Sequence, residues 1–263
     1  MRGLLIYVYI LIIFTSCSEY QKIIKSEDYQ FIYSKAVELY NQKDYHRSLN
    51  LFEYVQHVYV GTSKAQDIAH YRAYCSYHLK DYASASGLFK NFIKNYPESS
   101  NSEESLFMIG YCEYLASPKA RLDQQISKSA LGNFQLYLDR YPNSERKDQI
   151  NIYMDELYNK LTYKDFLNAR NYFHREHYKS AIISFKNCLK DFPNTEYREE
   201  IMFMIFISAH EMAINSIAEK QLERYNDALE EFYVFSEEFP ESKHKQEIAI
   251  REKNIKEFLK NIE

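Results

Sequence analysis

A short motif that occurs four times constrains the fold of this 263-residue chain more than any other feature. Each copy consists of an aromatic residue, a proline, a polar residue and a hydroxyl residue. The copies are Tyr96-Pro97-Glu98-Ser99, Tyr141-Pro142-Asn143-Ser144, Phe192-Pro193-Asn194-Thr195 and Phe239-Pro240-Glu241-Ser242. Because proline stops a helix and serine or threonine can cap one, each motif predicts the end of one helix and the start of the next.

A second pattern precedes each motif at a fixed distance. A small residue lies twelve positions before each proline, an aromatic residue follows it by four positions and a larger residue by seven. These sets are Ala85, Phe89, Phe92; Ala130, Phe134, Tyr137; Ala181, Phe185, Cys188; and Ala228, Phe232, Phe235. Positions four and seven apart share one helical face, so each set predicts a buried stripe. A fifth copy (Ser48, Phe52 and Val55) lies upstream, with residues 60–62 in place of the proline turn.

This pattern resembles the second helix of a tetratricopeptide repeat (TPR), in which Ala, Phe and Pro have the same relative positions. The small residues are 37, 45, 51 and 47 positions apart, whereas a plain repeat gives about 34. We therefore expect longer first helices or longer connections within the segments 101–129 and 145–178. The predicted fold is all-α: a TPR-like α-solenoid of about five helix-turn-helix units, with a C-terminal capping helix over 243–261. A generic helical bundle is the alternative, but it does not account for the proline positions.

The first seventeen residues predict a secretory signal that ends at a cysteine. Arg2 provides a positive start, residues 4–14 are an unbroken apolar run, and two small residues precede Cys17. The run is about half as long as the ~20 residues of a spanning helix, and no later run approaches that length. This order resembles the bacterial lipobox, with Phe14 at the position where leucine is usual. An ordinary signal peptide with a chance cysteine is the alternative.

The lipobox resemblance implies how the chain is organised. Residues 1–16 would be a lipoprotein signal peptide, residues 17–25 a short extended tether anchored by lipid, and residues 26–263 the solenoid. It also implies acylation of Cys17 and a place in the outer membrane facing the periplasm, because no aspartate directly follows the cysteine. Each buried methylene contributes about 0.8 kcal/mol, so several acyl chains anchor permanently. Contact with the membrane is therefore expected through this anchor only.

Composition restricts the classes of function. The formal net charge is −4, and loss of Arg2 with the signal makes it −5, which argues against nucleic acid as a partner. Five glycines, five prolines and no tryptophan accompany 26 tyrosines and 17 phenylalanines, as expected for helices with bulky side chains between them. Cys75, Cys112 and Cys188 lie within apolar helical patterns. Their odd number prevents complete pairing within the chain, and we expect them in the core.

No pattern in the sequence predicts catalysis, a metal site or a cofactor. His174 and His177 have a spacing that metal ligands use, but structural zinc needs four ligands close together. We find no glycine-rich phosphate loop and no local signature of a catalytic triad. Paired glutamates such as Glu103 and Glu104 lie near basic residues and are interpreted as solvated helix faces. The sequence therefore predicts a protein that is not an enzyme and needs no cofactor.

Five further segments carry a family resemblance through their order and through the irregular repeat spacing. They are Gly110-Tyr111-Cys112-Glu113-Tyr114, Ser117-Pro118, Leu122-Asp123-Gln124, Tyr158-Asn159-Lys160-Leu161 and Lys220-Gln221-Leu222-Glu223-Arg224-Tyr225. Over essentially the whole mature chain the sequence resembles the BamD (YfiO-type) family of outer membrane assembly lipoproteins, most closely its Bacteroidetes branch. Thr162 stands where the family has glutamate.

The resemblance implies a function. Members of this family dock on the POTRA domains of the barrel protein BamA, within the β-barrel assembly machinery, and help to deliver unfolded outer-membrane β-barrel proteins. It also implies that the N-terminal units bind substrate and the C-terminal units bind BamA. Unfolded barrels expose alternating apolar strands with unpaired edges, which a groove of aromatic and charged side chains can hold. The candidate groove residues, all on first helices, are Tyr33, Tyr40, His70, Arg72, Tyr74 and Tyr77.

Two other classes of lipid-anchored TPR protein are alternatives. A SusD-like glycan-binding lipoprotein would be much longer and would usually carry tryptophans that stack on sugars, and this chain has none. A TPR protein of cell division or peptidoglycan binding usually includes a coiled coil, and no sustained heptad pattern is present.

Overall fold

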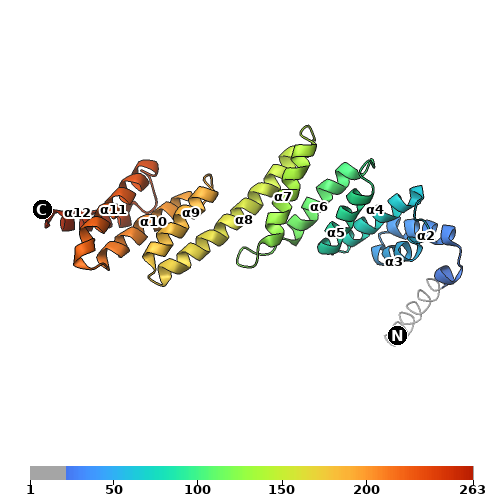
Figure 1. Cartoon of the computed structure of the whole chain (residues 1–263), viewed down its shortest axis with the longest axis horizontal. Coiled ribbons are helices and arrows are strands. Elements are labelled where there is room, and N and C mark those ends of the chain that lie inside the picture. Colours follow the sequence, from blue (N-terminus) through green and yellow to red (C-terminus); the bar gives the residue numbers. More distant parts are fainter. Residues whose placement is uncertain (1–21, 263) are drawn as a thin grey trace, which may run out of the picture. The chain divides into compact units, whose positions relative to one another are not determined.

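The computed structural model describes residues 22–262, which form helices joined by turns (Figure 1). The helices are α2 (Tyr29–Asn41), α3 (Tyr45–Val55), α4 (Ser63–His78), α5 (Tyr82–Asn95), α6 (Ser102–Ala116), α7 (Gln125–Arg140), α8 (Lys147–His174), α9 (Tyr178–Asp191), α10 (Arg198–Ile214), α11 (Ala218–Glu238) and α12 (Lys245–Lys260). Within the described residues α2 to α11 form five consecutive pairs, and α12 follows them. This confirms the predicted all-α, TPR-like fold. Over the same range no helix has the length and apolar character needed to cross a bilayer.

The chain divides into two compact units. The first contains the chain up to Ser117 together with Gln125–Lys147, and therefore includes α2 to α7. The second contains Pro118–Gln124 together with Asp148–Glu263, and therefore includes α8, apart from its first residue, to α12. In the first unit each helix packs against the next one along the chain, as in stacked helical repeats.

The chain before α2 is described only in part. The signal peptide and Cys17 lie outside the described residues, so the predictions for them stay predictions. Residues 22–25 are helical, although the sequence analysis expected an extended tether up to residue 25. Ile23 and Ile24 pack against the core of the first helix pair, and this contact gives the segment an apolar face to bury.

The repeated stripe of the second helices is buried, as predicted. The small residue at its start has no exposed surface in any of the five copies, and the aromatic residue four positions later is fully buried in four of them. Phe232 is the exception, because it is only partly buried. The Ser48 hydroxyl donates a hydrogen bond to the backbone oxygen of Ala36 at 2.9 Å, across the first helix pair. A small residue is therefore needed here for the two helices to approach each other.

The proline turns end the second helices, as predicted, but their hydroxyl residues act one step earlier than expected. Ser144 Oγ accepts a hydrogen bond from the backbone N–H of Arg146 at 3.3 Å, and Ser242 Oγ accepts one from His244 at 3.0 Å. The N-cap residues of α6, α10 and α12 lie two positions after the turn hydroxyl residues, and their own side chains make no capping hydrogen bond. The hydroxyls therefore stabilise the turn before the helix rather than the helix itself.

The turns within the first two pairs follow a different rule. Lys43 and Lys80 adopt left-handed conformations, with φ of 64° and 63°. The aspartate that follows each lysine caps the second helix of its pair. Asp44 accepts a hydrogen bond from the backbone N–H of Arg47 at 3.3 Å, and Asp81 accepts one from that of Ser84 at 3.2 Å.

The extra residues predicted within the segments 101–129 and 145–178 lie in two places. One is the connection 117–124 between α6 and α7, where Gln124 Nε2 donates to the backbone oxygens of Lys119 at 2.9 Å and Leu122 at 3.2 Å. The other is α8, a first helix of 28 residues. The Leu-Asp-Gln segment of the sequence therefore fixes the shape of a connection.

The second unit ends in a buried helix and a covering helix. α10 is buried on every side over residues 201–210, and it packs against both α9 and α11. α12 follows α11, buries Ile248 and Ile255, and stacks Phe258 on Tyr225 with ring centroids 3.9 Å apart. Its other face consists mainly of exposed lysine and glutamate, as expected of a capping helix.

Candidate functional site

The predicted groove residues lie on α2 and α4, and all their side chains are half-buried. Four of them are linked by ring contacts: His70 lies 4.9 Å from Tyr74, Tyr74 lies 6.3 Å from Tyr77, and Tyr40 joins this group through His78, which is 6.1 Å from both Tyr40 and Tyr74. Several of them also hold neighbouring helices together. Arg72, for example, donates to Gln56 at 2.6 Å and pairs with Glu53 at 3.4 Å, and so ties α4 to the end of α3. The Tyr74 hydroxyl donates to Glu104 of α6 at 2.6 Å.

A row of rings crosses the first three helix pairs. Tyr45 stacks on His78 with centroids 4.2 Å apart, and Tyr40 lies 5.5 Å from Tyr45. His78 is 5.2 Å from Tyr77, which is 6.2 Å from Tyr111. These separations are typical of interacting aromatic pairs. We refer to Tyr40, Tyr45, Tyr77, His78 and Tyr111 as the aromatic row.

The aromatic row includes three residues that the sequence analysis did not select. Tyr45 follows the turn aspartate, His78 directly follows a selected residue, and Tyr111 lies in the Gly-Tyr-Cys-Glu-Tyr segment. Tyr45 could have been selected from the sequence, because a tyrosine directly follows the turn aspartate twice, at Tyr45 and Tyr82. Burial raises the pKa of Tyr40 to about 12, so its phenol remains neutral and offers a ring face and a hydroxyl rather than a charge.

A contact between the turn that ends a helix pair and the first helix of that pair recurs in several pairs, with different residue types in each. The residue two positions after the turn hydroxyl lies over an aromatic ring of the first helix. Lys64 lies 5.1 Å from the Tyr33 ring, Arg146 lies 4.4 Å from the Phe107 ring and His244 lies 3.7 Å from the Phe203 ring. The same side chains pair with Gln30, Glu104 and Glu200, three positions before each ring. In the fourth pair Tyr197 stacks on Phe166 at 6.3 Å. We call this contact the repeat tie.

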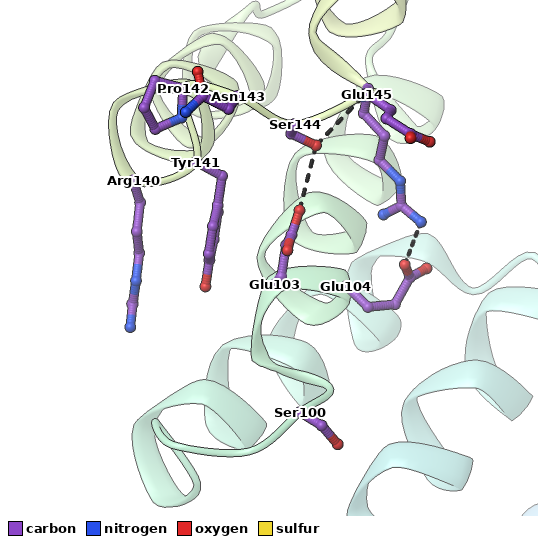
Figure 2. A pocket seen from close by; sticks show the side chains of 10 residues that line it. Ser100, Glu103, Glu104, Arg140, Tyr141, Pro142, Asn143, Ser144 and Glu145 are labelled. Atoms are coloured by element: carbon purple, nitrogen blue, oxygen red, sulfur yellow. Dashed lines mark hydrogen bonds and ion pairs between the residues drawn. The ribbon is translucent and has the colours of Figure 1, made fainter.

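The repeat tie of the third pair lies beside an open hollow of about 720 Å³ (Figure 2). Glu103 and Glu104, at the start of α6, face the turn that follows α7. Ser144 Oγ donates to Glu103 at 3.3 Å, and Arg146 pairs with Glu104. Arg140 adds a second guanidinium, 5.8 Å from the neighbouring Tyr141 ring. At this turn, therefore, guanidinium groups of the chain itself lie at a carboxylate and at an aromatic ring.

A second open hollow, of about 630 Å³, lies at the corresponding turn of the second unit. Its walls are one face of α8 and the turn between α9 and α10. The lining residues are Asp155, Tyr158, Asn159 and Thr162 of α8 and residues 191–196 of the turn. The part of α8 from Asp155 to Thr162 forms one wall of this hollow, and the turn forms the other.

The three cysteines within the described residues are free and buried, as predicted. Burial raises the pKa of Cys75 to about 11 and of Cys112 and Cys188 to about 12. Thiols with such values carry almost no thiolate at neutral pH, so they are poor nucleophiles and poor metal ligands. Over residues 22–262 no group of three or more His, Cys, Asp or Glu side chains is placed to hold a metal ion.

His70→Phe is expected to stabilise the protein. The His70 Nε2 atom is buried without a hydrogen-bond partner, and an unsatisfied buried donor or acceptor costs about 1–3 kcal/mol. Burial also lowers the pKa of His70 from 6.5, against the opposing effect of Glu104 and Asp67. The unfolded chain therefore binds more protons than the folded chain below pH 6.5, and stability falls as the pH drops through this range.

Urea unfolding at pH 7.5 and pH 5.5 measures both effects. The variant should be more stable than the wild type by about 1 kcal/mol at pH 7.5. Its advantage should be larger at pH 5.5. An advantage that is equal at the two pH values would show that protonation of His70 does not contribute.

Comparison with known proteins gives one family match. The model of the family described as "YfiO: Outer membrane lipoprotein" matches residues 25–224, from before α2 into α11. No curated protein matches the chain. Among solved structures, the chain is similar to the TPR2AB-domain:pHSP90 complex of yeast Sti1. That match has 11% sequence identity and a TM-score of 0.38, and it covers 87% of this chain and 98% of the other.

Proposed function

The chain belongs to the YfiO family of outer membrane lipoproteins, and on this premise we propose that it is a lipid-anchored periplasmic scaffold of the β-barrel assembly machinery. The family match over residues 25–224 is the observation that carries the proposal. In this role the C-terminal helix pairs dock on the POTRA domains of a BamA-type barrel protein. The N-terminal pairs receive unfolded barrel proteins, and Cys17 holds the scaffold at the membrane.

The aromatic row supports the assignment of substrate binding to the first unit. A strand of an unfolded barrel alternates apolar and polar residues, and its aromatic residues need a surface that shields them. The rings of the row touch across three helix pairs, and all are half-buried except that of His78, which is exposed; they offer such a surface along an extended segment. Because these rings are already fixed by packing, little side-chain entropy is lost when a peptide binds.

Substitution of the aromatic row is expected to weaken peptide binding. Tyr77→Ala combined with His78→Ala removes two central rings, and each lost aromatic contact is worth about 0.5–1.5 kcal/mol. The dissociation constant for a labelled peptide that copies one barrel strand should rise about tenfold, measured by fluorescence anisotropy. Tyr172→Ala is the control, since Tyr172 is an exposed tyrosine of α8 outside the row. Equal binding by both variants would remove the row from the proposal.

Cys17→Ala is expected to release the protein from the outer membrane. Without the thiol no diacylglycerol can be attached, and the proposal includes no other membrane anchor. Fractionation of cells that express the variant should find it in the soluble periplasmic fraction, whereas the wild-type chain should sediment with outer membranes. A Cys75→Ala variant provides the control for loss of a cysteine that is buried in the first unit. Retention of Cys17→Ala in the membrane fraction would contradict the anchor.

Affinity purification tests the assembly role directly. A tag after α12 would be used to isolate the full chain from detergent-solubilised membranes, and mass spectrometry would identify what accompanies it. The proposal expects a β-barrel protein with POTRA domains as a stoichiometric partner. Recovery of a TonB-dependent sugar transporter in its place would show that the chain serves glycan uptake.

A further inference from the structure

The turn between α3 and α4 exposes two valines. Val60 is 76% exposed and Val58 is 39% exposed. Residues 56–63 contain no lysine, arginine, aspartate or glutamate, whereas the corresponding segments of the other helix pairs (93–100, 138–145, 189–196 and 236–243) each contain at least two. At the position of Val58 those segments have Asn95, Arg140, Asp191 and Glu238. The first of the five turns therefore presents an apolar, uncharged surface where the other turns are charged.

Four tyrosines lie at the same end of the first helix pair. The ring of Tyr59, within the turn, lies 5.8 Å from that of Tyr33. Tyr29, the first residue of α2, stacks on Tyr54 near the end of α3 at 6.3 Å. All four rings are half-buried. Tyrosine rings beside exposed aliphatic side chains are typical of surfaces at a membrane–water interface, where the ring lies at the level of the lipid headgroups.

The other end of this pair has the opposite character. The turn between α2 and α3 consists of Gln42, Lys43 and Asp44, and the side chains of the first two are exposed. Tyr40 and Tyr45 of the aromatic row flank this turn, with ring centroids 5.5 Å apart. We call this the polar end of the first pair, and we call residues 56–63 with the start of α2 the apolar end. Contact with an apolar surface favours the apolar end only.

The chain enters the first pair at its apolar end. The ring of Tyr29 lies 6.1 Å from that of His57 in the turn. Residues 26–28 join α2 to the helical segment 22–25, and Cys17 lies five positions before Lys22. Because an extended chain covers at most about 3.6 Å per residue, the Cα atom of Cys17 lies no more than about 18 Å from that of Lys22. A lipid on Cys17 therefore keeps the apolar end close to the bilayer.

We propose that the apolar end rests on the membrane that holds the lipid anchor, with Val58 and Val60 in the headgroup region. This placement rests on acylation of Cys17, which belongs to the proposed function, and it adds a contact to the anchor, which the sequence analysis expected to be the sole one. Two valines bury far less apolar surface than an acyl chain, and a single acyl chain already binds only marginally. The turn is therefore no second anchor. It orients the first unit so that the aromatic row begins at the end that points away from the bilayer.

A fluorescent label on the turn tests the proposal. The full acylated chain with Val60→Cys would be purified in detergent, labelled with nitrobenzoxadiazole and reconstituted into vesicles of phosphatidylethanolamine and phosphatidylglycerol. The cysteines at 75, 112 and 188 are buried, so the chain without the substitution should take up no label. We expect the emission of the labelled turn to shift to shorter wavelength in vesicles. Lipids with a nitroxide on the headgroup should then quench most of it.

Leu79→Cys provides the matched control. Leu79 is 40% exposed, as Val58 is, but it follows the end of α4 beside the polar end of the first pair. Its label should keep the emission that it has in water and should not be quenched. Addition of Val58→Asp to the Val60→Cys chain should reduce the quenching of the turn, because a charge resists transfer out of water. Circular dichroism melts confirm that each variant is folded.

Flotation of the vesicles distinguishes the anchor from the turn. A wild-type chain that does not float with the vesicles would contradict acylation of Cys17, and with it the premise of this placement. A chain that floats while the label at position 60 stays in water would overturn the contact of the turn and leave the anchor intact. Equal quenching of the labels at positions 60 and 79 would also overturn it, because the membrane would then not distinguish the two ends.

Discussion

Phe185→Ala is expected to lower the free energy of unfolding by about 3–5 kcal/mol, the usual cost of deleting a fully buried phenylalanine ring. Phe185 has no exposed surface, and its ring lies 5.8 Å from that of Phe166 in the core of the second unit. The substitution leaves a cavity between α8 and α9 that neighbouring side chains can fill only in part. Loss of packing in one repeat also weakens its stacking on the next, since repeat arrays depend on contacts between neighbours.

Phe232→Ala is the matched control, because Phe232 has the same place in the repeat but is only partly buried. Its loss should be clearly smaller. Urea unfolding gives the two free energies, and hydrogen exchange locates the effect: the Phe185 variant should exchange faster in α8 to α11 and normally in α2 to α5. If both variants lost the same stability, burial at this repeat position would not be what determines its contribution.

Gly110→Ala is expected to destabilise the first unit, although alanine favours a helix over glycine. A Cβ atom at Gly110 would lie 2.7 Å from Cδ1 and 2.9 Å from Cε1 of Phe134, whose ring is fully buried. The ring cannot move aside without displacing its own neighbours, and such overpacking costs typically about 1–3 kcal/mol. This exceeds the gain of about 1 kcal/mol in helix propensity.

Gly132→Ala provides the opposite result in the same unit. Gly132 lies within α7, and a Cβ atom there meets nothing within 4 Å. This variant should be more stable than the wild type by about 1 kcal/mol, since only helix propensity changes. Thermal unfolding of the two variants should therefore shift the midpoint in opposite directions. An upward shift for Gly110→Ala would mean that α6 and α7 can separate slightly at low cost.

The helix pairs and their buried stripes could be predicted from sequence because they depend on residues close together in the chain. Ala130, Phe134 and Tyr137 occupy one face of one helix, and the proline turn that follows is local as well. The long α8 was predicted only as extra residues. No proline or glycine lies within it, but nothing local determines whether such a segment forms one helix or two.

The candidate sites could be predicted less well, because their residues meet across long separations. Arg146 and Glu104 are 42 positions apart, and only the packing of α6 against α7 places them together. Tyr45 and His78 stack across two helix pairs. The second hollow depends on the packing of α8 alongside the turn between α9 and α10, and its two walls are far apart in the sequence, since Asp155 lies 36 positions before Asp191. A periodic pattern carries no information about such pairings.

The repeat ties have a consequence for how the chain finds its native arrangement. Helix pairs with nearly identical buried stripes could exchange neighbours during folding, and misassembly of this kind is a known failure of repeat proteins. Lys64 with Gln30, Arg146 with Glu104, Tyr197 with Phe166 and His244 with Glu200 give four of the five junctions different chemistry. A pair placed at the wrong junction would bring together groups that do not match, so the ties select one order for the array.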